Sequence, residues 1–336
     1  MRAFVVDAPR SSAVASVAPP VPGPHDLLVD VERVGICGTD VELYLGQMAY
    51  LDQGITHFPL RLGHEWTGTV TAVGSSANEH WIGTRVTGDT MLGCGHCRFC
   101  LAGHQHVCPD RFEVGILDGW AGALAEQLLI PARFALAIPD SVSVTAAALV
   151  EPGGNALRAV DAAALESGQS LLILGSGTIG LLAAQFALAR GIDVHVAGDR
   201  PGSLELAHTL GVEHTHALGA VDGQFGAVID ATSSATAPAL ATRLVDPAGW
   251  VVFIGLSSTP SLVDTRDLAL KDVTAVGILS ASPGLAGAIE LFASGAVAPD
   301  ALVAEVVGLD EVADRLEGRR GPNAGPGPKV HVDPRL

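Results

Sequence analysis

The chain has 336 residues, more than a single compact core usually accommodates, and this length favours two domains. Hydrophobic residues make up 48% of the chain and charged residues 16%, which provides ample apolar surface for a core and argues against disorder. With 19 basic and 36 acidic side chains the net charge is −17, so nucleic acid and anionic membranes are not expected as partners.

The N-terminal segment, residues 1–10, lacks the sustained apolar core and the cleavage site of a signal peptide. The sequence also contains no run of about 18 apolar residues, so we expect no membrane span.

The first 150 residues are predicted to form a β-rich domain. Short apolar runs interrupted by Gly and Pro occur at 27–35, 66–74 and 84–89. This texture is typical of short strands joined by loops.

Four of the five cysteines are clustered in one short loop. They are Cys94, Cys97, Cys100 and Cys108. Thiolates at this spacing can close a tetrahedral shell around Zn²⁺, and neighbouring glycines let the loop fold back on the ion. Ordinary buried or disulfide-bonded cysteines are the weaker interpretation, because such clustering would be a coincidence. We therefore predict a structural zinc site, and zinc-type cysteines without a secretion signal indicate a reducing cytoplasm.

From about residue 149 the pattern changes to strands that alternate with helices. The expected strands are 171–175, 194–198, 227–232, 250–256 and 272–279. Helices are expected from the first strand to Arg190, near 203–210 and at 283–295, before a final short strand at 329–332. Alternation of this kind predicts a parallel α/β sheet, and the nearly continuous hydrophobicity of the strands fits burial on both faces.

A glycine-rich turn follows the first of these strands. Gly175, Gly177 and Gly180 match G-x-G-x-x-G, with Thr178 and Ile179 inside the motif. Between a strand and a helix, this motif predicts a turn that binds the pyrophosphate of a dinucleotide at the helix N-terminus.

The residues after the second strand are expected to select between NAD and NADP. Asp199 lies about where an acid that binds both ribose hydroxyls is expected. The turn at 191–194 is short, however, and would move Gly198 into the selector position and leave Arg200 to face a phosphate. The two signals conflict, and on balance we slightly favour NADP.

A second set of metal-binding side chains is dispersed along the sequence. Cys37, His64, Glu65 and Glu151 are each unremarkable alone. Together they offer thiolate, imidazole and carboxylate, a mixed set that can hold zinc and leave a position open for water or substrate.

With these motifs in place, the chain resembles a zinc-dependent medium-chain dehydrogenase/reductase of the alcohol, polyol and sugar dehydrogenase branch. The resemblance rests on segments in the family's order: MRAFV at the N-terminus, CGTD (37–40), GHE (63–65), the four cysteines, EP (151–152) and GSGTIG (175–180). It implies an α/β protein in which a GroES-like catalytic domain, 1–150 with 290–336 returning to it, flanks a Rossmann domain at 151–289.

The resemblance also implies two Zn²⁺ per chain, one structural and one catalytic. Cys37 and His64 correspond to ligands of the catalytic zinc, and Glu65 and Glu151 compete for the remaining positions because family members differ in which acid binds.

Other residues take expected roles from the same resemblance. Thr39 matches the hydroxyl that relays the substrate's proton, and Asp40 matches the acid that orients His64. Asn155 is expected near the nicotinamide or the substrate. Glu42 or a neighbour stands where several relatives carry a histidine that completes the proton relay, which makes a polar sugar or polyol substrate more plausible.

The expected reaction is hydride transfer between a small-molecule secondary alcohol, polyol, sugar or cyclitol and NAD(P). A primary alcohol or aldehyde reductase is the second hypothesis, and a non-catalytic nucleotide-binding protein is the third. The resemblance further implies a homotetramer or homodimer.

Overall fold

The computed structural model describes residues 1–117 and 119–336 and divides them into two compact units. Unit 1 comprises Met1–Glu151, Val303–Gly325 and Lys329–Leu336, and unit 2 comprises Pro152–Leu302 and Pro326–Pro328. In the described part of the chain, no helix is both long enough and apolar enough to cross a membrane.

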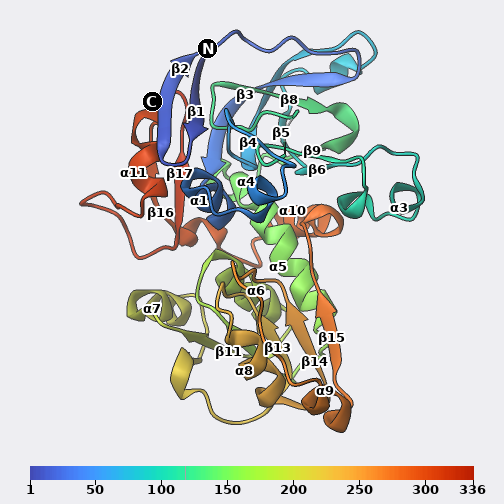
Figure 1. Ribbon diagram of the computed structural model, residues 1–336, viewed down its shortest axis with the longest axis vertical. Helices are drawn as coiled ribbons and strands as arrows, with labels where there is room; N and C mark the ends of the chain where they lie inside the picture. Colours follow the sequence, from blue (N-terminus) through green and yellow to red (C-terminus); the bar gives the residue numbers. More distant parts are fainter. Residues whose placement is uncertain (118) are drawn as a thin grey trace. The chain divides into compact units, whose positions relative to one another are not determined.

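Unit 1 is built mainly from antiparallel strands (Figure 1). Its strands are β1 (Arg2–Ala8), β2 (Ser11–Ser16), β3 (Asp26–Gly35), β4 (Glu65–Val73), β5 (Arg85–Gly88), β6 (Met91–Leu92), β7 (Phe112–Glu113), β8 (Gln127–Pro131), β9 (Ala135–Ala137), β16 (Val303–Val307) and β17 (Lys329–Val332). The largest sheet has the order β16-β17-β3-β4-β5-β9, with β8 paired to β3. The β-rich texture predicted for the first 150 residues is confirmed, since the three expected strands correspond to β3, β4 and β5.

Short helices connect these strands. They are α1 (Gly38–Leu45), α2 (Ala49–Asp52), α3 (Arg98–Leu101), α4 (Val144–Ala148) and α11 (Val312–Leu316). The apolar sides of β3 and β4 form the core with Leu27, Val29 and Trp66, all fully buried.

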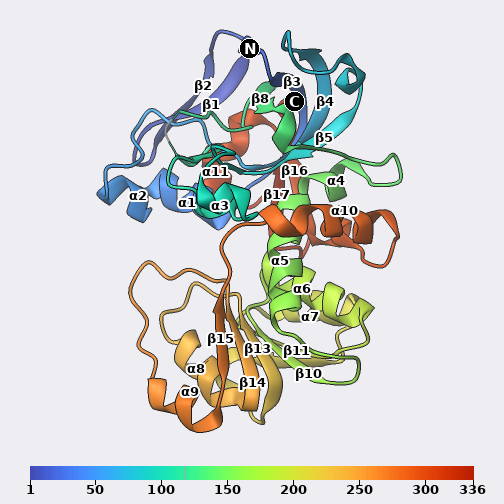
Figure 2. The ribbon, with the colours of Figure 1, turned by 90° about the vertical axis from the view of Figure 1, so that its right-hand side faces the viewer.

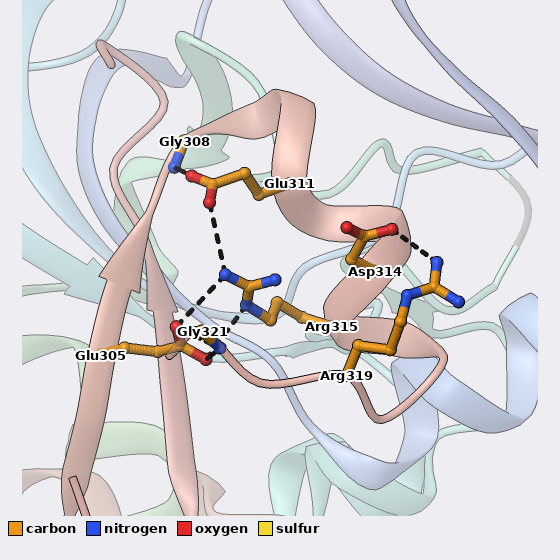
Figure 3. A network of polar contacts seen from close by, with 7 residues as sticks. All are labelled: Glu305, Gly308, Glu311, Asp314, Arg315, Arg319 and Gly321. Carbon is orange, nitrogen blue, oxygen red and sulfur yellow. Dashed lines mark hydrogen bonds and ion pairs between the residues drawn. The ribbon is translucent and has the colours of Figure 1, made fainter. Parts of the chain in front are cut away.

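The returning C-terminal segment adds two strands to unit 1. β17 pairs with β3 through His331 opposite Gly35, and β16 lies at the edge beyond it. Figure 3 shows how Arg315 fixes this segment: its guanidinium donates to Glu305 at 3.2 Å and to Glu311 at 3.3 Å. The Arg315–Glu305 pair is largely buried, with the two side chains 7% and 11% exposed, whereas Glu311 is 52% exposed.

Unit 2 contains a six-stranded parallel sheet. Its strands are β10 (Ser170–Leu174), β11 (Asp193–Gly198), β12 (His214–Ala217), β13 (Phe225–Asp230), β14 (Val245–Phe253) and β15 (Thr274–Gly277). They run in the order β12-β11-β10-β13-β14-β15, which is the order of the Rossmann dinucleotide-binding fold. The predicted parallel α/β sheet is thus confirmed.

Helices follow most of these strands. They are α5 (Val150–Ala162), which begins at the end of unit 1, and α6 (Thr178–Ala189), α7 (Pro201–Thr209), α8 (Ala237–Leu244), α9 (Thr265–Lys271) and α10 (Leu285–Ala293). Helices α6 and α7 pack against β10, β11 and β12, whereas α8 packs against β13 and β14 (Figure 2).

The chain returns to unit 1 at Val303, later than the residue 290 implied by the family resemblance. Helix α10 packs inside unit 2, which explains the later position. The rings of Phe292 and Phe186 lie 6.0 Å apart, and a side chain at Gly153 would contact Phe292 and Ala288.

Candidate metal and cofactor sites

The sheet of unit 1 brings Cys37, His64 and Glu65 together. Their ligand atoms all lie within 4.8 Å of one another. Cys37 follows the end of β3 as the N-cap of α1, and Glu65 is the first residue of β4. Because β3 and β4 pair with Gly35 opposite Glu65, the two chain segments reach this point side by side.

Gly35 makes the close approach possible. A Cβ at this position would lie 2.1 Å from Oε2 of Glu65, so any side chain would displace the carboxylate.

Asp40 joins the loops that carry Cys37 and His64. Its carboxylate accepts hydrogen bonds from the Cys37 N–H at 2.9 Å and the Gly63 N–H at 3.2 Å. Its Oδ1 also lies 3.4 Å from Nδ1 of His64, at ion-pair distance but without hydrogen-bond alignment. Asp40 is completely buried and His64 is 4% exposed.

His64 and Asp40 shift each other's pKa through their opposite charges. Burial opposes a charge on His64, but the Asp40 carboxylate outweighs it and holds the pKa of His64 well above its usual range. Burial likewise raises the pKa of Asp40, but the charge of His64 and the hydrogen bonds from the Cys37 and Gly63 N–H groups bring it below its ordinary value. A carboxylate at one ring nitrogen is the usual partner of a metal-binding histidine, and it leaves the other nitrogen available as a ligand.

Lys329 provides a partner for Glu65 that was missed from the sequence. Its Nζ donates to both carboxylate oxygens, at 2.6 and 2.8 Å, and to the carbonyl of Ile36 at 3.0 Å. Both side chains are nearly fully buried. Burial works against the ammonium charge, but Glu65 outweighs it and raises the pKa of Lys329. The buried carboxylate is therefore charge-compensated.

The donor set fits zinc. Sulfur, imidazole nitrogen and carboxylate oxygen converge within 4.8 Å of one another, and these are the ligand types that zinc binds in proteins. Glu151 is buried in the first turn of α5, and the structure does not place it within the group formed by Cys37, His64 and Glu65.

The remaining predicted site residues lie on two helices. Thr39 is half-buried in the first turn of α1, next to Asp40. Asn155 is half-buried on α5, within unit 2.

The four clustered cysteines also converge. Their sulfur atoms all lie within 4.8 Å of one another, with Cys94 and Cys100 at 3.9 Å and Cys97 and Cys108 at 3.7 Å. All four are free thiols, so the disulfide interpretation is wrong. Backbone N–H groups point at three of the sulfurs, including the Cys97 N–H at 3.4 Å from the sulfur of Cys94.

The crowding of these thiols favours a bound cation. The N–H of His96, with that of Cys97, lowers the pKa of Cys94 to about 6. In contrast, burial and hydrogen bonds from neighbouring thiols raise the pKa of Cys100 to about 12. Four negative sulfurs at these distances repel one another, and a divalent metal removes the conflict.

The glycine-rich turn has the shape that a pyrophosphate requires. Gly175 has φ +109°, and a Cβ at Gly180 would lie 1.9 Å from the Gly175 carbonyl oxygen. Gly177 instead faces open space, since a Cβ there would have no neighbouring atom within 4 Å, and it caps the N-terminus of α6. Thr178 and Ile179 begin that helix, so their backbone N–H groups lack helical partners.

The selector residues follow β11 directly. Gly198 is buried, and a Cβ there would lie 2.2 Å from the hydroxyl of Ser176 in the glycine-rich turn. Asp199 and Arg200 are both exposed, and Arg200 is the N-cap of α7. This arrangement keeps the backbone of Gly198 against the turn and leaves both charged residues open to a ribose or its phosphate.

The four-cysteine loop also contains a buried histidine. His106 lies between Cys100 and Cys108 and is 6% exposed.

Comparisons with known proteins agree with this geometry. The family profile "Alcohol dehydrogenase GroES-like domain" matches residues 23–140, and the profile "Zinc-binding dehydrogenase" matches residues 178–294. An L-threonine 3-dehydrogenase from Chelativorans sp. (strain BNC1) is 33% identical over 292 residues, which is 83% of each chain.

Solved structures show the same architecture over the whole length. A zinc-binding dehydrogenase from Sinorhizobium meliloti 1021, bound to NADP, is 30% identical, with a TM-score of 0.90 over 99% of both chains. An alcohol dehydrogenase from Escherichia coli CFT073 in complex with NADH is 25% identical, with a TM-score of 0.89 over 99% of both chains. The chain therefore belongs to the zinc-dependent medium-chain dehydrogenases and is an NAD(P)-dependent oxidoreductase that acts on a small molecule.

Proposed function

We propose that the protein oxidises a secondary alcohol group of a polar small molecule, with NADP⁺ as the preferred hydride acceptor. The observation that carries this proposal is the buried group of Cys37, His64 and Glu65. A mixed donor set of this kind is typical of catalytic rather than structural zinc. The curated relatives named L-threonine 3-dehydrogenase support a secondary alcohol, because the hydroxyl that such an enzyme oxidises is secondary.

Each protein residue has a distinct part in the proposed mechanism. Cys37 and His64 hold the zinc with a carboxylate, for which Glu65 and Glu151 are the candidates, and Asp40 orients the His64 ring. When bound there, Zn²⁺ supplies Lewis-acid polarisation of the substrate oxygen. The Thr39 hydroxyl accepts the substrate's proton and passes it toward solvent.

Lys329 is proposed to balance the charge of Glu65. By binding both oxygens of Glu65, it keeps that carboxylate charge-balanced whether or not it binds the metal. Asn155 is proposed to contact the substrate or the nicotinamide. The four cysteines would hold the second zinc of the chain, which has no open position and therefore supports the fold only.

The cofactor preference rests on Gly198 and Arg200. With Gly198 against the glycine-rich turn, an acid does not occupy that backbone position, and the exposed Arg200 can pair with a 2′-phosphate. The NADP-bound structure from Sinorhizobium meliloti supports this preference. Asp199 is the residue that would instead favour NAD.

Formation of reduced nicotinamide tests the proposal directly. L-threonine, secondary alcohols, polyols, sugars and cyclitols are supplied separately with NAD⁺ and NADP⁺, and primary alcohols serve as the comparison. We expect turnover with a secondary alcohol and a higher kcat/KM for NADP⁺. Turnover of primary alcohols alone, or a preference for NAD⁺, would contradict the respective part of the proposal.

We further propose that the protein assembles as a homodimer or homotetramer through the sheet of unit 2. Strand β15 lies at the edge of that sheet with Thr274, Ala275 and Gly277 exposed, and Leu270 in the preceding helix is 86% exposed. Unpaired edges with nearby apolar side chains are natural pairing surfaces. Light scattering that reports a monomer would contradict this assembly.

A further inference from the structure

Unit 2 contains a third group of metal-binding side chains, at the amino ends of two neighbouring strands. Strand β11 begins at Asp193 and strand β12 begins at His214. The parallel register places His195 opposite His214 and Ala197 opposite His216. Since side chains alternate along a strand, the register brings the three imidazoles to one face of the sheet.

The ligand atoms of Asp193, His195 and His214 all lie within 4.8 Å of one another. The Asp193 carboxylate lies 3.5 Å from Nε2 of His195 and 3.7 Å from Nε2 of His214. Tetrahedral Zn²⁺ with bonds of about 2.0–2.1 Å separates its ligand atoms by roughly 3.3–3.4 Å. Movements of a few tenths of an ångström therefore convert this arrangement into a coordination shell.

The rings are already positioned by their neighbours. His195 and His214 stack with their centroids 4.4 Å apart and their planes 16° apart. The ring of Phe225 packs edge-on against His195 at 4.9 Å. His195 is only 18% exposed, so the packed rings restrict its motion.

His216 contacts the nitrogen of His195 that faces away from Asp193. Its Nε2 lies 3.0 Å from Nδ1 of His195, on the opposite side of the ring from Asp193. If His195 donates its Nδ1–H to His216, its Nε2 presents a lone pair to the carboxylate, and a cation is needed between them. A ligating histidine normally donates its other ring N–H to such a partner.

We propose that Asp193, His195 and His214 bind a divalent transition-metal ion of the Zn²⁺ type. The ion would join the edge strand β12 to β11 and stabilise that side of the sheet. It would be separate from the cofactor site, because the glycine-rich turn follows the carboxyl end of β10 whereas this group lies at the amino ends of the strands.

Zinc content and amide exchange test the proposal in the full-length protein. The wild type, Asp193→Asn, His214→Gln and His80→Gln are dialysed at a series of buffered free Zn²⁺ concentrations, and bound zinc per chain is measured. His80 is the matched control, a surface imidazole of unit 1 stacked on Trp81. We expect the wild type and His80→Gln to bind one more zinc ion per chain than Asp193→Asn and His214→Gln. If the latter two variants still bind this ion, we expect their affinity for it to be at least about tenfold lower.

Hydrogen exchange provides the second measurement. Added Zn²⁺ should slow the exchange of β12 amides in the wild type and in His80→Gln, and leave it unchanged in Asp193→Asn and His214→Gln. Equal zinc content in all four proteins would overturn the proposal. Equal zinc content with faster β12 exchange in the variants would assign the cluster to a metal-free hydrogen-bonded chain, which also overturns it. Zinc content and amide exchange can both be measured without knowledge of the substrate or of the cofactor preference.

Discussion

The two candidate zinc groups of unit 1 are assembled in contrasting ways. The four cysteines lie within one loop, so a short segment carries the whole coordination shell. The group of Cys37, His64 and Glu65 instead depends on the pairing of β3 with β4, and on Lys329 from β17 near the C-terminus. A shell of four thiolates from one loop is suited to a structural role. In a mixed shell that draws on several strands, single residues can change the charge at the metal or leave a coordination position open.

The largest effect is expected when one cysteine is replaced in each of the two zinc groups. Cys37→Ser should lower kcat by about a thousandfold, because loss of the Lewis acid removes several kcal/mol of transition-state stabilisation. Cys97→Ser should lower kcat much less, but it should deprotect the amides of residues 93–108. Steady-state kinetics, zinc content and hydrogen exchange measure these effects, and full activity in Cys37→Ser would refute the catalytic assignment.

Replacement of Lys329 should destabilise unit 1. Lys329→Met leaves the buried Glu65 carboxylate without its cation, at an expected cost of about 3–5 kcal/mol in the free energy of unfolding. Denaturant titration measures the change. The double variant Lys329→Met with Glu65→Gln should recover much of the loss, because no buried charge is then left alone. An equal loss in the single and double variants would show that the lysine contributes by packing rather than by charge.

The Asp40 carboxylate should tune zinc affinity without binding zinc itself. Asp40→Asn should weaken binding at the mixed group by about 10–100-fold, because the amide no longer stabilises the oriented His64 ring. Competition with a chromophoric chelator measures the affinity. Asp52→Asn, an exposed acid of the same unit, is the control and should bind zinc like the wild type. The four-cysteine loop should keep its zinc in both variants.

The smallest effects are expected in the returning segment, where Arg315 and Arg319 differ in burial. Arg315→Gln removes a side chain that is 7% exposed and pairs with Glu305, whereas Arg319 is 58% exposed and pairs with Asp314 and Glu317. We expect about 2 kcal/mol of destabilisation for Arg315→Gln and less than about 0.5 kcal/mol for Arg319→Gln. Thermal unfolding measures both, and similar losses would show that burial is not the deciding variable.

Features that depend only on residues close together in the sequence could be predicted. The spacing of four cysteines, and a glycine motif between a strand and a helix, each define their geometry within a few residues. The parallel sheet of unit 2 was predictable for the same reason, because five of its six strands contain a short apolar run. Strand β12, His214–Ala217, was missed because its sequence, HTHA, is largely polar.

Contacts between distant segments were not predictable in this way. Lys329 meets Glu65 across 264 positions of sequence, and a lone lysine in a short C-terminal strand carries no pattern that indicates a buried partner. His195 and His214 lie in different strands, and only the register of β11 with β12 brings them together. Polar and apolar residues alternate in β17, Lys329-Val330-His331-Val332, as in a half-exposed strand, so no signal in the sequence indicated that Lys329 is buried.

The return of the C-terminus to unit 1 has a consequence for synthesis on the ribosome. Almost all of unit 2 is continuous in sequence, so it can fold as soon as Leu302 has emerged. Only the end of β3, at Val34 and Gly35, lacks its partner until β17 has been synthesised, and the Arg2 guanidinium donates a hydrogen bond to the carbonyl of Leu336. A nascent chain halted before residue 303 would therefore carry a finished dinucleotide-binding unit beside a sheet with an open edge, a natural target for chaperones.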